Sequence, residues 1–158
     1  MKAAVAVVLA LLLAGCATNP GKDLSPGMSM AEAEAAMGKP KETLVDSAGR
    51  TVWFYPTAPA EPRRTWAVRL APDGRVQSVE QRLTRENISR VVRGMNKSQV
   101  RELLGPPWKA YQLPRLPYEE WDYRVTTDLD NDLLIRFTAD GIVHEASLLH
   151  DPKYDRGP

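Results

Sequence analysis

The fold is decided by a stretch that occurs twice: residues 27–32 read GMSMAE, and residues 94–99, 67 positions later, read GMNKSQ. Further landmarks recur in the same order. The landmarks that recur 67 positions later are Gly38 and Gly105, Pro40 and Pro107, Arg69 and Arg136, and Asp-Gly at 73–74 and 140–141. Two aromatic residues, Trp53 and Tyr55, match Trp121 and Tyr123 at an offset of 68. Landmarks in one order at one spacing indicate repeated structural units. We therefore expect two tandem modules, at residues 27–84 and 85–150.

Each module begins with a predicted helix whose ends are marked in the sequence. Ser29 and Asn96 are favourable N-caps, and a Glu or a Gln follows three residues later, as in a capping box. Gly38 and Gly105 suit the position after a helix, and the prolines two residues further on prevent its continuation. A second, short helix is expected at 87–93, and the first module shows no evident counterpart to it.

After each helix the apolar residues alternate with polar ones, as on a half-buried strand. The clearest run is 119–125, which places Trp121, Tyr123 and Val125 on one face. The Asp-Gly pairs favour hairpin turns that lead to last strands at 75–83 and 142–149. The segments 57–64 and 111–117, each with proline, are the expected loops. The predicted class is α+β: two small tandem modules, each with one or two helices packed on a three- to four-stranded antiparallel sheet.

The amino terminus has the features of an export signal. Lys2 precedes an unbroken apolar run at residues 3–13, which is too short to span a bilayer, since that takes about 20 residues. The run ends in Leu-Ala-Gly-Cys, and this resembles the bacterial lipobox. Cys16 is the only cysteine of the chain, so we predict a signal peptide at 1–15, lipidation at Cys16 and a flexible tether at 16–26. Ala17 follows instead of Asp, which implies an outer-membrane anchor facing the periplasm.

Charge and composition exclude several classes of function. The formal net charge is +1, and it falls to zero once the signal with its single Lys is removed, which argues against nucleic-acid binding. His144 and His150 are too far apart on one strand for a shared metal. The run 128–132 resembles a calcium loop, but Leu133 and Ala139 stand where Gly and Glu are needed. We expect no catalytic residues, no metal and no cofactor, and a frayed tail at 151–158.

Two groups of side chains are candidates for contact with a partner. Four cations recur between residues 90 and 101, and a tryptophan and a tyrosine lie beside prolines shortly after them. The candidates are Arg90, Arg93, Lys97, Arg101, Trp108 and Tyr111. Such cations could bind anionic phospholipid head groups or an acidic protein. The alternative is an ordinary solvated helix face.

The order of motifs resembles the SmpA/OmlA family, also called BamE-like, here as a tandem of two modules. The motif residues are Gly27, Gly38, Pro40, Trp53, Tyr55, Gly94, Gly105, Pro107, Trp121 and Tyr123. The resemblance implies a lipoprotein that binds other envelope proteins, including the β-barrel assembly machinery, and that supports outer-membrane protein assembly or envelope integrity as an interaction module. Tandem modules of similar build also occur in β-lactamase inhibitory proteins. The alternative function is therefore a periplasmic inhibitor or sensor that binds an enzyme through its sheet faces.

Overall fold

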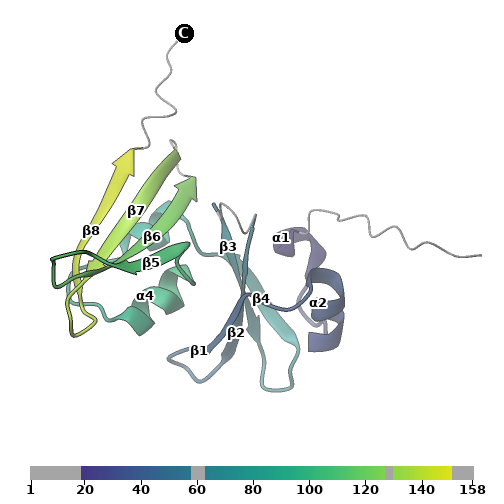
Figure 1. The fold of residues 1–158 in the computed structure, drawn as a ribbon. Coiled ribbons are helices and arrows are strands. Elements are labelled where there is room, and N and C mark those ends of the chain that lie inside the picture. Colours follow the sequence, from purple (N-terminus) through teal and green to yellow (C-terminus); the bar gives the residue numbers. More distant parts are fainter. Residues whose placement is uncertain (1–18, 58–62, 127–129, 151–158) are drawn as a thin grey trace, which may run out of the picture.

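The computed structural model describes residues 19–57, 63–126 and 130–150 (Figure 1). The first module contains α1 (Pro20–Asp23), α2 (Met30–Met37), β1 (Glu42–Val45), β2 (Thr51–Pro56), β3 (Thr65–Leu70) and β4 (Val76–Gln81). The second contains α3 (Arg85–Ser89), α4 (Lys97–Leu104), β5 (Lys109–Gln112), β6 (Glu119–Thr126), β7 (Asp130–Phe137) and β8 (Val143–His150). The strand orders are β1-β2-β3-β4 and β5-β6-β7-β8, all antiparallel. The predicted α+β fold in two tandem modules is confirmed.

The two modules repeat each other in detail. Ser29 and Asn96 each form a complete capping box at the start of α2 and α4. The hydroxyl of Tyr55 donates to the carbonyl of Gly38 at 3.1 Å, and the hydroxyl of Tyr123 donates to that of Gly105 at 3.0 Å. Positions that differ by 67 or 68 in number therefore occupy equivalent places, and the modules can be compared residue by residue.

Each module has its own core between helices and sheet. In the first module it contains Leu24, Ala33, Trp53, Tyr55, Val68, Leu70 and Val76. In the second it contains Ile88, Val100, Leu104, Trp121, Tyr123, Ile135 and Phe137, among others. The paired aromatic residues of the repeat are all less than a tenth exposed, so they belong to these cores.

Three local expectations are wrong. The first module does have a first helix, α1, which Asn19 caps through its side chain. Leu24 directly after it is only 5% exposed and packs in the core, so residues 20–24 belong to the module and not to the tether. The helix expected at 87–93 begins and ends earlier, at Arg85–Ser89. β5 extends through residues 111 and 112, which were expected to form a loop.

The signal peptide at 1–15, Cys16 and the tail at 151–158 lie outside the described residues. Of the helices that are described, none combines the length and apolar character that crossing a bilayer requires.

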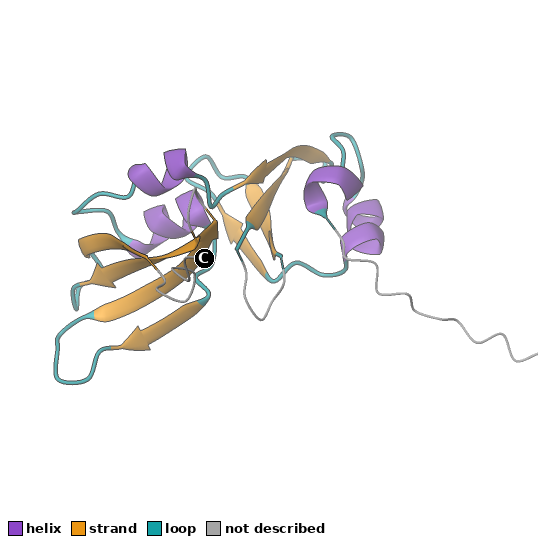
Figure 2. Cartoon of the chain, turned by 90° about the horizontal axis from the view of Figure 1, so that it is seen from above, coloured by secondary structure: helices purple, strands orange, loops and turns teal. Residues whose placement is uncertain are grey.

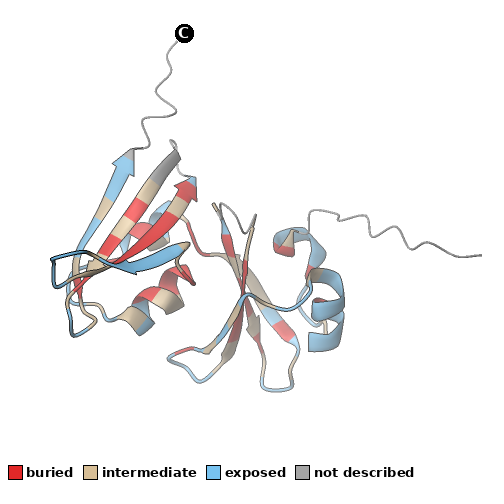
Figure 3. Cartoon of the chain, in the orientation of Figure 1, coloured by how far each residue is buried: buried red, intermediate tan, exposed pale blue. Residues whose placement is uncertain are grey.

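The modules pack so that the two sheets have different surroundings (Figures 1 and 2). One face of the first sheet carries α1 and α2, and its other face, which we call the junction face, turns toward α4 of the second module. The second sheet is covered on its inner side by α3 and α4. On its other side, which we call the open face, no helix of the described chain packs, and β8 is exposed along most of its length (Figure 3).

Candidate functional site

The junction face of the first sheet is apolar at its centre. Val52, Phe54 and Ala67 form a small cluster and are at most 2% exposed. The backbone after α4 approaches this cluster closely. A Cβ added at Gly105 would lie 2.7 Å from Cγ2 of Thr65 and 3.0 Å from Cδ1 of Phe54. The close approach requires glycine at this position, so Gly105 serves both as helix cap and as the contact point between modules.

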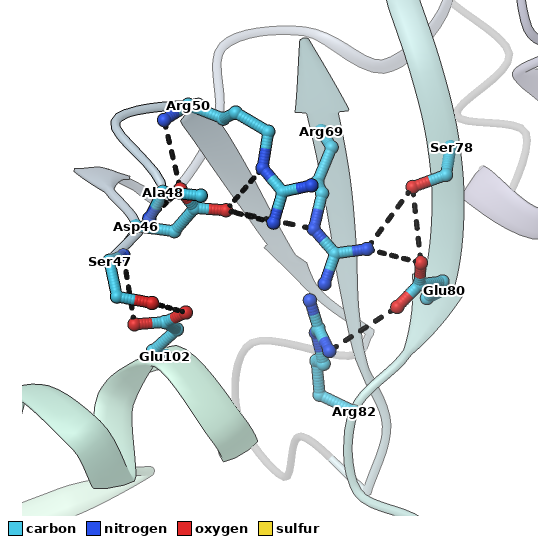
Figure 4. Close-up of polar contacts among 9 residues, drawn as sticks. All are labelled: Asp46, Ser47, Ala48, Arg50, Arg69, Ser78, Glu80, Arg82 and Glu102. Atoms are coloured by element: carbon cyan, nitrogen blue, oxygen red, sulfur yellow. Dashed lines mark hydrogen bonds and ion pairs between the residues drawn. The ribbon is translucent and has the colours of Figure 1, made fainter.

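A network of ion pairs lies beside this apolar centre and runs from the turn after β1 across β3 to β4 (Figure 4). The buried carboxylate of Asp46 accepts hydrogen bonds from the backbone and the guanidinium of Arg50, at 2.9 and 2.8 Å. Burial alone would raise the pKa of Asp46, but these hydrogen bonds lower it below its ordinary value. Asp46 is therefore charged near neutral pH, and Arg69 lies 3.8 Å from the same carboxylate.

The network continues across the sheet to β4 and the segment after it. Arg69 pairs with Glu80, which also lies 3.3 Å from the guanidinium of Arg82. Arg82 is only 7% exposed, and its burial and the neighbouring Arg69 lower its pKa. Three arginines and two carboxylates thus form this network, and each carboxylate lies between two of the guanidinium groups.

Two polar links join α4 directly to β1 and the turn after it. The carboxylate of Glu102 accepts hydrogen bonds from the backbone nitrogen of Ser47 at 3.1 Å and from its hydroxyl at 2.9 Å (Figure 4). Arg101 pairs with Glu42 at 3.3 Å. Both links connect the modules, and they fix α4 beside the first strand of the first sheet.

A groove of about 600 Å³ lies between β1 and α4. Its lining consists of residues 42–47 on one side and Asn96, Ser98, Gln99, Arg101 and Glu102 on the other. β1 is an edge strand. Asp46 donates from its backbone nitrogen to Arg50 across the ladder, and hydrogen-bonded pairs alternate along such a ladder. The backbone groups of Thr43 and Val45 therefore point away from β2 toward the free edge, and the Val45 side chain is 67% exposed.

The open face of the second sheet is charged where the junction face is apolar. Asp122 occupies the position equivalent to Phe54, paired in register with Lys109 and Leu134. It is only 8% exposed, and among the described residues its Oδ1 has no hydrogen-bond partner. Burial, together with the nearby carboxylate of Asp132, raises the pKa of Asp122 to about 6.

The predicted basic residues do not share one helix face. α3 ends at Ser89 and α4 begins at Lys97, so Arg90 and Arg93 lie in the connection between them and are exposed. Lys97 pairs with Glu119 at 2.6 Å, and the guanidinium of Arg101 lies 5.2 Å from the ring centre of Trp121. Arg90 and Arg93 are exposed and the side chains of Lys97 and Arg101 are partly exposed, and head-group binding by these four residues stays a prediction.

The two predicted aromatic contacts lie at the edge of the second sheet. Trp108 is half-buried, with the ammonium of Lys109 at 3.9 Å and the guanidinium of Arg124 at 4.5 Å from its ring centre. Tyr111 is 41% exposed, and its hydroxyl donates to Glu120 at 2.6 Å. This hydrogen bond raises the pKa of Tyr111 to about 12. Tyr111 lies on β5 rather than in a loop.

The described residues hold no group of three or more His, Cys, Asp or Glu side chains placed for a metal ion. His144 instead stacks on Tyr118, with ring centres 4.8 Å apart. Of the run 128–132, which resembles a calcium loop in sequence, residues 128 and 129 are outside the described chain, and Asp132 pairs with Arg124 at 3.5 Å.

Of the residues that line the groove, sequence reasoning named Arg101 as a partner contact and missed the others as site residues. β1 has only four residues and no strong alternation, so no pattern predicted it. Glu102 and Ser47 are 55 positions apart, and neither belongs to a repeated landmark. The turn at residues 46–49, with its Asp and Gly, was the one local signal near the site.

No family model matches the chain, and no curated protein is significantly similar to it. Two solved structures are similar in fold at low scores. A DUF4309 family protein (YjgB) from Bacillus subtilis is 12% identical, covers 78% of each chain and has a TM-score of 0.32. A "putative beta-lactamase inhibitor protein" from Streptococcus mutans is 16% identical, covers 84% of this chain and 88% of its own, and has a TM-score of 0.35.

These findings correct the resemblance to the SmpA/OmlA family. Neither similar structure belongs to that family, and no family model supports it. The motifs that suggested it, such as a capped helix followed by Gly-x-Pro, encode helix ends and turns, which many small α+β modules need for physical reasons. The identification is therefore wrong.

Proposed function

We propose that this chain is a lipid-anchored envelope protein that acts by binding another protein, as an inhibitor or sensor of an envelope enzyme, and that it receives an extended segment of that partner along β1. The anchor is the thiol of Cys16, at the periplasmic side of the outer membrane. The observation that carries the proposal is the groove between β1 and α4.

The groove suits an extended peptide better than a compact ligand. One wall is a strand edge whose backbone groups at Thr43 and Val45 point outward, and such an edge binds a further strand through main-chain hydrogen bonds. The other wall is a polar helix face with Asn96 and Gln99, which could bind the side chains of that strand. β1 contains neither Lys nor Pro, the residues that commonly protect an edge from such pairing.

The placement of the groove also gives the partner a rigid site. The ion pairs of the junction face hold β1 against its neighbours, and the links from Glu102 and Arg101 fix the helix on the other side. A binding site held on regular elements loses little entropy when it is occupied. The sheet faces do not combine into one binding surface, because the junction face is buried.

The test is site-specific photo-crosslinking of the full chain in cells. A photoreactive residue replaces Ser98, which lines the groove and is exposed, and the control replaces Ser89, which is exposed on α3. We expect one envelope protein to crosslink at position 98 and not at 89, and its enzymatic activity to change when the chain is added. No partner at position 98 would disprove the function.

A second pair of variants tests the binding mode. Val45→Pro removes a backbone N–H that points to the free edge, whereas Val45→Thr keeps it. Crosslinking from position 98 should disappear with proline and persist with threonine. Equal crosslinking by both variants would show that the partner does not add a strand to β1.

A further inference from the structure

We propose that the open face of the second sheet binds the end of α2 of a second copy, so that copies associate head to tail by repeating the packing between the two modules of one chain. This inference concerns a different surface from the groove, and it is independent of the proposed function. It rests on equivalent positions whose environments can be compared directly.

The packing to be repeated is the contact between α4 and the junction face. There Gly105, at the end of α4, lies against Phe54 and Thr65. The equivalent glycine at the end of α2 is Gly38, which is exposed and has no described atom within 4 Å of the place where a Cβ would be. Among the described residues, no helix covers the open face at one end of the molecule, and no sheet covers the end of α2 at the other.

Charges at the equivalent positions are complementary. Inside the chain, Arg101 on α4 pairs with Glu42 on β1. The equivalent of Arg101 is Glu34 on α2, and the equivalent of Glu42 is Lys109 on β5. Both signs are reversed, so the pair between two copies remains attractive. If these two surfaces did not bind each other, the charges at the two positions would be alike as readily as opposite.

A second complementary pair lies at the centre of the same contact. Phe54 is replaced on the open face by Asp122, whose Oδ1 is buried and has no partner among the described residues. Beside Gly38 the chain has Lys39, exposed, where the second module has the buried Pro106. Lys39 therefore takes the place of an apolar residue, Pro106. In the contact between copies it would face Asp122, which takes the place of Phe54. The Lys39 ammonium would lie opposite the Asp122 side chain and add a positive charge to those of Arg124 and Lys109 near it.

Such a contact joins two different surfaces and does not close on itself by symmetry. It produces rings or open chains of copies rather than only dimers. We therefore expect the full chain, solubilised in a mild detergent, to show a concentration-dependent series of species in sedimentation velocity. A monomer at every concentration would disprove the proposal.

Charge reversal makes the test specific. Glu34→Lys alone and Lys109→Glu alone each place like charges opposite each other, and each should weaken association about fivefold to tenfold. The chain that carries both substitutions restores an attractive pair and should associate nearly as the original does. Glu86→Lys, an exposed reversal on α3, is the matched control and should change nothing.

Two results would overturn the proposal: single reversals without effect, or a double variant that stays as weak as the singles. Val45→Pro separates this surface from the groove. It should abolish partner crosslinking and leave association between copies unchanged, so each proposal can fail without the other.

Discussion

The two sheets share strand order and register, yet their equivalent faces are built from different kinds of residue. On the junction face the central position is Phe54, fully buried beneath the second module. On the open face the same position is Asp122. The residues that both modules keep, such as the tyrosines bonded to the helix-end glycines, define the module itself. The residues that differ reflect what each face contacts. The junction face of the first sheet packs against the second module and is apolar, whereas the open face of the second sheet has no helix of the described chain on it and is charged.

The largest effect should come from removing the apolar centre of the covered face. Phe54→Ala deletes a ring that is 0% exposed and should lower the free energy of unfolding by about 3–5 kcal/mol. Urea denaturation measures this. Leu149→Ala, at a half-exposed position on the open face, is the control and should cost less than about 0.5 kcal/mol. A loss below about 1 kcal/mol at Phe54 would mean that the modules do not pack through this face.

The helix-end glycines allow a closer comparison. Gly38 and Gly105 have nearly the same backbone angles, with φ of 76° and 83°, so alanine brings similar backbone strain to both. Only at Gly105 would the new methyl group also collide with the other module. Gly105→Ala should therefore destabilise the fold by about 2–4 kcal/mol and Gly38→Ala by about 1–2 kcal/mol. Thermal unfolding of both variants tests this, and equal losses would contradict the tight contact.

Asp122 should make stability depend on pH. Its pKa of about 6 in the folded chain exceeds the value of about 4 in an unfolded one. The folded chain therefore holds the proton more tightly. The resulting stability is full below about pH 4 and is lost as the pH rises through about 6. Burial is the main cause of the raised pKa, because it favours the neutral, protonated carboxyl. The nearby carboxylates of Asp132 and Glu120 also favour the protonated form, whereas the charges of Arg124 and Lys109 favour the ionised form.

The size of this effect is about 1–3 kcal/mol. Asp122→Asn should remove that part of the pH dependence and make the chain more stable than the original at pH 8. Denaturation at pH 4.5 and pH 8 measures both. A pH profile that is the same for the two chains would show that the Asp122 carboxyl is hydrated and titrates normally.

Much of the fold could be predicted from the sequence because each local signal occurs in both modules. Capping boxes, Gly-x-Pro stops and Asp-Gly turns act locally, so helix starts at Met30 and Lys97 could be placed to the residue. α1 was missed because it has only a single turn, although Asn19 and Pro20 are a favourable N-cap and first helical residue. So short a helix also needs tertiary packing, which the burial of Leu24 supplies.

The candidate site could not be predicted for a related reason. The groove exists only because one module packs on the other, and the repeat says nothing about that packing. The four basic residues could share one face only on a continuous helix, and Gly94, with φ of 96°, lies between two separate helices. Spacing predicts a shared face only within one element.

The smallest expected effect concerns the link from Glu102 to Ser47, which has no equivalent in the first module, where Ala35 stands in place of Glu102. Glu102→Ala should cost about 1 kcal/mol, since two hydrogen bonds to a carboxylate are lost at a partly exposed position. Ser47→Ala removes only the bond from the hydroxyl, and the double variant completes a thermodynamic cycle. The coupling energy should be about 0.5 kcal/mol. Zero coupling would mean that this link adds nothing, and that apolar packing and the pair between Arg101 and Glu42 hold the modules together. The groove would then lack a fixed wall at this end, because α4 is held beside β1 by these polar links.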